Sequence, residues 1–260
     1  MKFTLKSLSL VLVTSASTVA FADDAPALPF GLEFSGSAAM TTDYRFRGMS
    51  QNENDPAVQA GFHLASKSGL YAGVWGSNVK LANGDTETAN LELDPYIGYT
   101  YTFEDVAFTP WVDVGIWYYG YPSNSDLAFA EYYVKAGVSG LIASNDGLNV
   151  TANYTNKFWG GKDNAWYFSM GYAVPFGETG FGANANVGYT TVSNNTDEKY
   201  FNGKDHYTDW KVGVTYDFKS ISGFTAELAA VGTDISKNGL DKATKRLNDT
   251  GAVFTLTKSF

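Results

Sequence analysis

Charged residues recur at every second position in parts of this sequence. Asp43, Arg45 and Arg47 do so, and so do Glu92 and Asp94. Residues two apart on a β-strand share one face, and guanidinium groups bind carboxylates bidentately. Two chemistries follow from this spacing. The groups could line a passage and set its preference for ions or solutes, or they could brace an enclosed interior as an ion-pair network that joins the first strand to Glu92 and Asp94.

Catalytic chemistry finds little support in the sequence. The two histidines, His63 and His206, fit no recognisable pattern with a nucleophile, and no H-E-x-x-H, G-x-S-x-G or P-loop spacing occurs. The absence of cysteine excludes disulfides and Cys-ligated metals. We therefore predict no enzyme, no catalytic residues, no cofactor site and no metal site, and we expect His63 to be a hydrogen-bonded residue of a polar face.

The elements that must position these charges are β-strands. Apolar and polar residues alternate with a period of two along most of the chain, and helical periodicity is nearly absent. Between residues 91 and 103, Leu, Ile, Tyr and Phe share one face while Glu92 and Asp94 lie on the other. We predict twelve strands, at residues 32–47, 57–66, 70–80, 89–102, 107–119, 129–141, 147–157, 164–176, 180–192, 206–218, 223–233 and 250–260.

Short and long connections alternate between these strands. The short ones are residues 66–69, 103–106, 142–146, 177–179 and 219–222. The longer ones are residues 48–56, 81–88, 120–128, 158–163, 193–205 and 234–249. Outer-membrane barrels have short periplasmic turns, longer external loops and, in single chains, an even number of strands. The pattern predicts such a barrel with both termini on the periplasmic side.

The two strand faces differ in composition. The apolar face carries aromatic residues near strand ends, such as Tyr99, Phe103, Trp166 and Phe176, as in the aromatic girdles at bilayer interfaces. The other face is rich in Gly, Ser, Thr and Asn, as a wet lumen would be. A soluble β-sandwich or lipocalin-like barrel turns its apolar face inward and would carry more Lys and Glu outside. The sequence therefore favours an all-β, antiparallel transmembrane barrel.

Several aromatic residues fall on the face predicted to point inward. They either offer a stacking surface for sugars or nucleosides or simply fill space in a narrow barrel. On the third strand the orientation stays open, because Tyr71 and Trp75 compete with Leu70 and Val74 for the lipid-facing side. The inward aromatic candidates are Tyr71, Trp75, Trp111, Trp117, Tyr119 and Tyr133.

The first 22 residues have the features of a secretory signal peptide. Lys2 and Lys6 precede an apolar stretch from Leu8 to Ala20, and the small-x-small pattern at residues 20–22 fits cleavage before Asp23. The apolar stretch is too short to span a bilayer, which needs about 20 residues. We predict a signal peptide at 1–22 and a barrel at 23–260. Without Lys2 and Lys6, 16 basic residues face 27 acids, and this net charge of −11 argues against a nucleic-acid partner.

The last predicted strand ends on an aromatic residue. Phe260 closes an alternating segment and resembles the signal read by the outer-membrane assembly machinery. Lys258 departs from that signal, which usually has a hydrophobic residue two places before the end. A long Lys stem can extend its charge toward the interface. We therefore expect the assembly machinery to be a partner of this chain.

Three segments carry a resemblance to a known family. They are Thr41–Gln51 followed by Asp55–Gln59, Gly69–Val79, and Glu92–Tyr99. Together they resemble the TorF-type porin family of proteobacteria, conserved outer-membrane proteins of unknown function, and the resemblance extends along the chain after residue 22. It implies location in the outer membrane of a Gram-negative bacterium and a presumed channel, without naming a substrate.

The leading hypothesis is a channel that passes small hydrophilic solutes through a narrow polar lumen. A structural or surface-binding barrel with an occluded lumen is the second hypothesis, and a membrane hydrolase is the third. A twelve-stranded pore is expected to be monomeric and narrower than general porins of 16–18 strands. Acids in the external loops could contact lipopolysaccharide through divalent cations or simply form a solvated surface. The candidate pore-lining residues are Asp43, Arg45, Arg47, Glu92, Asp94, Asp113, Glu131, Lys135, Lys211 and Asp217.

The charges assigned to the inner face are predominantly acidic. With Glu33 and Glu227 added to the candidates, eight acids face four bases. This balance predicts a preference for cations, although paired charges cancel.

Overall fold

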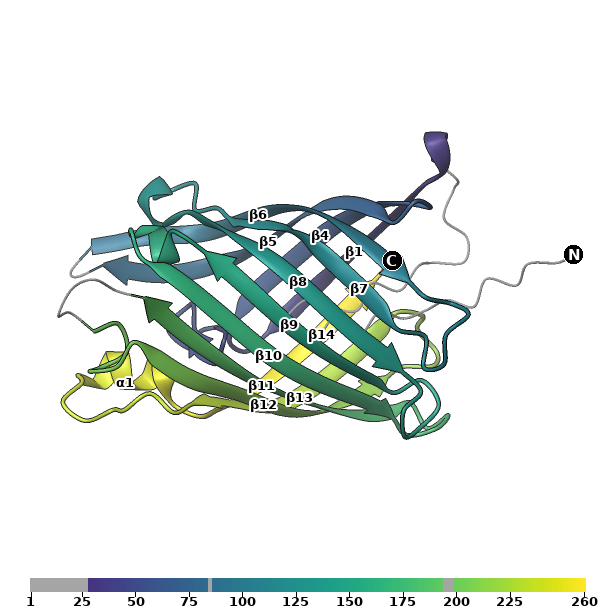
Figure 1. The fold of residues 1–260 in the computed structure, drawn as a ribbon. Coiled ribbons are helices and arrows are strands. Elements are labelled where there is room, and N and C mark those ends of the chain that lie inside the picture. Colours follow the sequence, from purple (N-terminus) through teal and green to yellow (C-terminus); the bar gives the residue numbers. More distant parts are fainter. Residues whose placement is uncertain (1–27, 84–85, 194–198) are drawn as a thin grey trace, which may run out of the picture.

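The computed structural model describes residues 28–83, 86–193 and 199–260. Twelve antiparallel strands close into a barrel in the order β1-β14-β13-β12-β11-β10-β9-β8-β7-β6-β5-β4 (Figure 1). They are β1 (Leu32–Thr41), β4 (Ala57–Ser66), β5 (Leu70–Asn83), β6 (Thr86–Thr102), β7 (Trp111–Tyr119), β8 (Phe129–Ser139), β9 (Gly147–Thr155), β10 (Asn164–Pro175), β11 (Phe181–Ser193), β12 (His206–Asp217), β13 (Phe224–Thr233) and β14 (Gly251–Ser259). The predicted antiparallel barrel of twelve strands is confirmed. The predicted signal peptide lies outside the described residues.

A few short elements are not part of the barrel wall. Two of them, β2 (Arg45–Phe46) and β3 (Met49–Ser50), form a small separate hairpin. The others are the 3₁₀ turns η1 (Pro29–Gly31), η2 (Ser125–Leu127) and η3 (Phe158–Gly160), and the helix α1 (Lys242–Asn248). In the described ranges no helix has the length and apolar content that a membrane-spanning helix needs.

The barrel closes where its first and last strands meet. β1 pairs with β14 from Ser37↔Ser259 to Thr41↔Thr255, and Phe260 exchanges two backbone hydrogen bonds with Gly36, of 2.9 and 3.0 Å. The start of β1 and the end of β14 therefore lie at one end of the barrel, here called the terminal end. α1, η2 and η3 lie at the opposite end, here called the loop end (Figure 1).

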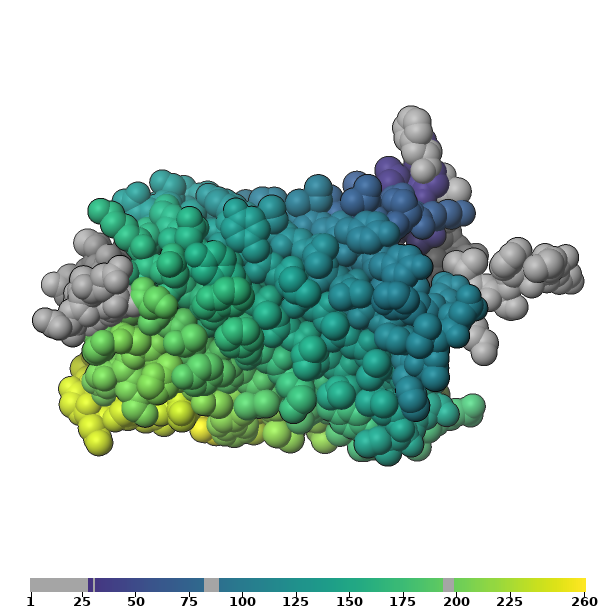
Figure 2. Space-filling view, viewed as in Figure 1, coloured from purple at the N-terminus to yellow at the C-terminus, as the bar shows by residue number. Residues whose placement is uncertain are grey.

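Apolar side chains cover the outside of the barrel. On β6, Leu93, Ile97 and Tyr101 are exposed, while Glu92 and Asp94, which point the other way, are buried. Figure 2 shows the outer wall as a closely packed surface over the teal and green strands. Because strand side chains alternate between faces, the period-two pattern produces a polar interior and an apolar exterior, as the sequence predicted.

Most predicted strand bounds lie within three residues of the observed ones. Two differ more. The strand predicted at 107–119 begins at Trp111, because Phe108 and Thr109 adopt positive φ angles of 64° and 43° in the preceding turn. The strand predicted at 32–47 ends at Thr41, so placing Asp43, Arg45 and Arg47 on its polar face was wrong.

Candidate functional site

The connection between β1 and β4 folds into the barrel instead of projecting from it. This segment, residues 42–56, is called the inner loop. Its hairpin turns at Arg47 and Gly48, which have positive φ angles of 48° and 83°. A Cβ on Gly48 would lie 2.5 Å from Cγ2 of Thr233 and 2.7 Å from the carbonyl oxygen of Gly232, so only glycine fits against β13.

Arg45 anchors the inner loop to the segment before β14. It forms an ion pair with Asp43 inside the loop and donates to the carbonyl oxygens of Leu247 (3.2 Å) and Asp249 (2.9 Å). It also donates to the carbonyl oxygen of Gly48 (3.1 Å) and to Oδ1 of Asn54 (2.8 Å), so nearly the whole guanidinium is engaged.

The carboxyl of Asp43 is held inside the same network. Burial raises its pKa, while the hydrogen bond from Ser50 (2.6 Å) and the charge of Arg45 act in the opposite direction. The net direction is upward, so this carboxyl takes up a proton more readily in the folded loop than it would in water.

Arg47 reaches across the lumen to the opposite wall. Its Nη2 donates to both carboxylate oxygens of Glu131 on β8, at 2.8 and 2.6 Å. Its guanidinium carbon lies 3.9 Å from the ring centroid of Tyr167 on β10, and its backbone oxygen accepts from Tyr207 on β12 (3.2 Å). The Arg47 and Glu131 side chains are only 6% and 2% exposed. Burial lowers the pKa of Arg47, but the carboxylate of Glu131 outweighs it and the pKa is raised.

Aromatic rings fix the side of the inner loop that faces β5–β8. Tyr44 packs edge-on against Trp75 (ring centroids 5.3 Å apart), and Phe46 packs edge-on against Tyr119 (5.4 Å). The buried cluster around Tyr44 also includes Tyr121 and Phe129. Burial raises the pKa of Tyr44, which keeps its hydroxyl neutral.

Glu92 and Asp94 do not join the arginines. Glu92 accepts from the Tyr121 hydroxyl (3.1 Å), and Asp94 accepts from Nε1 of Trp117 (2.9 Å) and from the backbone N–H of Gly120 (3.1 Å). The bracing network is therefore present, but with Glu131 as the acid that pairs with Arg47. The expected link from the first strand to Glu92 and Asp94 was wrong, because the chain turns inward at residue 42 and carries Arg47 past β6.

The remaining candidates lie apart from the inner loop. Asp113 accepts from the Tyr71 hydroxyl (2.6 Å), and the Lys135 ammonium lies 4.5 Å from the ring centroid of Tyr133. Lys211 pairs with Glu227 (2.8 Å). Asp217 is exposed at the terminal end, where it accepts from Thr225 (2.7 Å).

Most of the aromatic candidates line the lumen beside these charged groups. Trp111, Tyr119 and Tyr133 are buried, and the rest contact inward groups through the bonds and ring contacts given above. Leu70 and Val74 are exposed on the outer surface, which settles the orientation of the third predicted strand. His63 lies 3.0 Å from the Tyr96 hydroxyl through its Nδ1 atom.

Sequence reasoning missed three contributors to the site. Tyr167, Tyr207 and Asp209 surround the backbone and guanidinium of Arg47 from β10 and β12. The signal was present, because Tyr167 alternates with Trp166 and Phe168 and so belongs to the inner face. Alternation gives the face of each residue, but it does not indicate which distant residues contact Arg47, and these three lie 120 positions or more away.

The charged side chains of the lumen differ in how deeply they are buried. Toward the loop end, Asp43, Arg47, Glu131 and Asp209 are buried with the inner loop. Toward the terminal end, the side chains of Lys211 and Glu227 are 27% and 21% exposed. In the described part of the chain, no group of three or more His, Cys, Asp or Glu residues is arranged to hold a metal.

Comparisons with known proteins place the chain among bacterial barrels. A family profile described as "Bacterial protein of unknown function (Gcw_chp)" matches residues 25–260. No curated protein matches the sequence significantly. The NanC porin is 12% identical with a TM-score of 0.54, covering 86% of this chain and 97% of that one. The KdgM porin is 6% identical with a TM-score of 0.53, covering 87% and 99%. The KdgM porin in complex with disordered oligogalacturonate is 8% identical with a TM-score of 0.54, and the match covers 87% of this chain and 98% of that one. These likenesses show a shared fold.

Proposed function

We propose that this chain, which belongs to the Gcw_chp family of bacterial proteins of unknown function, is an outer-membrane channel for small hydrophilic solutes. The observation that carries the proposal is the closed barrel of twelve strands with an apolar exterior and a charged interior. A closed sheet satisfies all its backbone hydrogen bonds in lipid, and a lumen lined by charge is suited to ions and polar solutes.

The placement of the chain in the cell is part of the same proposal. A signal peptide at 1–22 would export it, the barrel at 23–260 would insert into the outer membrane, and both termini would face the periplasm. The loop end would then face outward, in contact with lipopolysaccharide. The TorF-type resemblance supports this arrangement, and the pore is proposed to act as a monomer delivered by the outer-membrane assembly machinery.

The inner loop defines the kind of channel. Its Arg47 touches side chains from β8, β10 and β12, so any solute from the loop end must pass beside or displace it. We infer a constricted channel with low basal conductance. Planar-bilayer recordings of pure refolded protein test this. Resolvable single-channel steps with a reversal potential that indicates cation preference are expected, and clear anion selectivity would contradict the charge balance of the lumen.

An occluded barrel with a binding role is the second candidate function. The observation that favours it is the nearly complete burial of the Arg47–Glu131 pair, which shows that the inner loop packs like a protein core. A wild-type protein that is folded yet shows no conductance steps under any voltage, together with an equally silent Arg47→Ala variant, would support occlusion over transport.

A hydrolase remains the least supported function. We infer that the chain is not an enzyme, since His63 contacts Tyr96 and His206 lies beside the ring of Tyr189. Release of fatty acid from phospholipid by the wild type, abolished in His63→Ala, would reverse this inference.

A further inference from the structure

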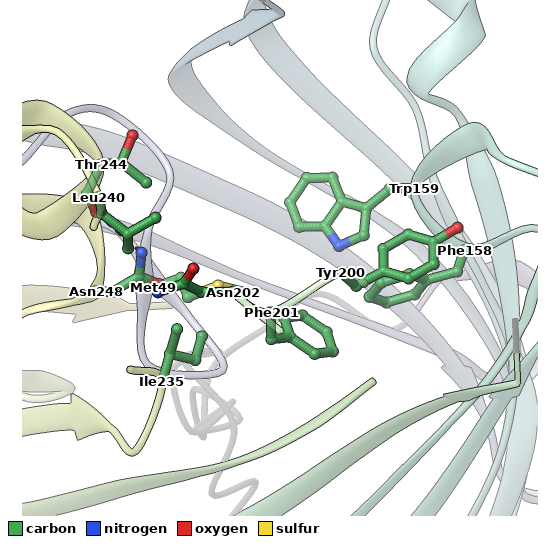
Figure 3. Close-up of a pocket in the computed structure, with 10 residues that line it drawn as sticks. All are labelled: Met49, Phe158, Trp159, Tyr200, Phe201, Asn202, Ile235, Leu240, Thr244 and Asn248. Atoms are coloured by element: carbon green, nitrogen blue, oxygen red, sulfur yellow. Dashed lines mark hydrogen bonds between the residues drawn. The ribbon is translucent and has the colours of Figure 1, made fainter. Parts of the chain in front are cut away.

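A cavity of about 270 Å³ opens at the loop end beside the inner loop (Figure 3). It lies between η3, the segment after residue 198, the connection between β13 and β14, and β3 of the inner loop. Its volume is near the lower limit of roughly 300 Å³ for ligand pockets, which suits one small ring. Ten side chains line it, among them those of Met49, Trp159 and Asn248.

The lining has two chemically different sides. Figure 3 shows Trp159, Phe158 and Tyr200 together on one side, and Thr244 and Asn248 on the other beside Leu240 and Ile235. None of the ten lining side chains carries a charge, although the chain has 27 acids and 18 bases. Flat aromatic faces opposite amide and hydroxyl groups favour a neutral solute with one apolar face and a polar edge.

Asn248 supplies a hydrogen-bonding group that the protein itself does not satisfy. Its side chain is buried, with the residue 7% exposed, and its Nδ2 donates to the carbonyl oxygen of Thr244 (2.9 Å). That bond fixes the orientation of the amide, and its Oδ1 has no partner within the protein. A buried acceptor without a partner is costly, so a donor from a bound molecule would stabilise this arrangement.

Trp159 is held in an unusual backbone conformation at the same cavity. Its φ and ψ are 49° and 43°, a left-handed region that large side chains rarely adopt. The following Gly160 lies so close to η2 that a Cβ would be 1.7 Å from the carbonyl oxygen of Asp126. Strained residues of this kind concentrate at ligand sites. Here the strain presents the indole to the cavity shown in Figure 3.

We propose that this cavity binds a neutral, ring-shaped polyhydroxy solute, such as an uncharged pyranoside, before it enters the channel. The role before transport rests on the proposed function, whereas binding itself does not. The apolar face of the ring would stack on Trp159 and a hydroxyl would donate to Oδ1 of Asn248. Because Met49 also lines the cavity, the bound solute contacts the inner loop directly.

The test is a binding titration on the full chain refolded in detergent micelles. The probes are methyl glucopyranoside, glucuronate and glucosamine, which are neutral, anionic and cationic rings of similar size. Calorimetry should show the neutral ring binding at least about tenfold more tightly than either charged ring, the factor expected for one buried interaction. Equal binding of all three rings, or no binding of the neutral ring, overturns the proposal.

Variants locate the site. Trp159→Ala and the near-isosteric Asn248→Leu, which removes the Oδ1 acceptor, should each weaken binding of the neutral ring by roughly tenfold. Trp166→Ala is the matched control, because Trp166 is exposed on the outer wall, and it should leave affinity unchanged. Heat-dependent gel migration checks that each barrel is folded. Unaltered binding in both folded cavity variants places the ligand elsewhere and overturns the proposal.

The titration needs no ion flow, so its outcome separates the two proposals. A folded barrel that binds the neutral ring but never conducts supports the cavity and contradicts the channel. A barrel that conducts but does not bind supports the channel and contradicts the cavity.

Discussion

The two ends of the lumen hold charged pairs that differ in burial. Toward the loop end, Arg47 of the inner loop and Glu131 form a pair whose side chains are almost fully buried. Toward the terminal end, Lys211 and Glu227 also pair, yet both stay partly exposed. A buried pair serves packing, whereas an exposed pair can act on passing ions. We infer that, in the proposed channel, closure and ion preference depend on different residues.

The largest expected effect comes from removing Arg47. Arg47→Ala leaves the Glu131 carboxylate buried without its partner, which costs about 3–5 kcal/mol in comparable cases. The inner loop should leave its place and single-channel conductance should rise several-fold, as measured in planar bilayers. Arg246→Ala is the matched control, because Arg246 is exposed on α1. If the two variants conduct alike, the loop-end half is not closed by this pair.

A glycine under an aromatic ring tests the half toward the terminal end. A Cβ on Gly115 would lie 2.4 Å from the Tyr133 hydroxyl and 2.5 Å from the carbonyl oxygen of Ile97. Gly115→Ala should displace the ring into the passage, lower the conductance and destabilise the barrel by about 1–3 kcal/mol, as overpacking does. At Gly61 the nearest side-chain atom would be 3.3 Å away, so Gly61→Ala should unfold in urea nearly as the wild type does.

A smaller effect is expected on ion preference. Glu227→Gln removes an acid from the partly exposed half and leaves Lys211 unpaired, so the reversal potential under a salt gradient should shift toward anions. The stability change should be about 1 kcal/mol or less, as for most partly exposed pairs. Glu131→Gln removes an equal charge from the buried half and is expected to shift selectivity less. If Glu131→Gln shifts the reversal potential more than Glu227→Gln does, the buried pair and not the partly exposed pair sets the ion preference.

The smallest effects concern the pH dependence of stability, which should have opposite signs for Asp146 and Asp43. At the terminal end, Asp146 accepts from the Tyr172 hydroxyl and from the backbone N–H groups of residues 141–143. These bonds lower its pKa. Its stabilising contribution is present above an ordinary carboxyl pKa of about 3.9 and declines as the pH falls toward the folded value.

Asp43 in the inner loop behaves in the reverse sense. Burial raises its pKa, so the folded loop is favoured as the pH falls and loses that contribution as the pH rises through the folded pKa. Melting midpoints measured between pH ~3 and ~7 should therefore change slope in opposite directions for Asp146→Asn and Asp43→Asn. Slopes that change in the same direction would show that one of the two environments is misassigned.

The barrel could be predicted from the sequence because alternation repeats in every strand. Leu93 and Glu92 each reveal their face without knowledge of any other strand. The inner loop could not, because Asp43, Arg45 and Arg47 imitate the same alternation after the strand has ended. Their partners are distant, since Glu131 is 84 residues from Arg47, and no local rule connects them. The positive φ of Arg47 and Trp159 depends on tertiary contacts that propensities do not encode.

The position of Arg45 also orders events during assembly. It belongs to the inner loop that follows β1, yet two of its acceptors, the carbonyl oxygens of Leu247 and Asp249, immediately precede β14. These acceptors come within reach only when the last strand has joined the first. The contacts of Arg45 can therefore be completed only when the final hairpin is in place, so that the last anchoring of the inner loop coincides with closure of the wall.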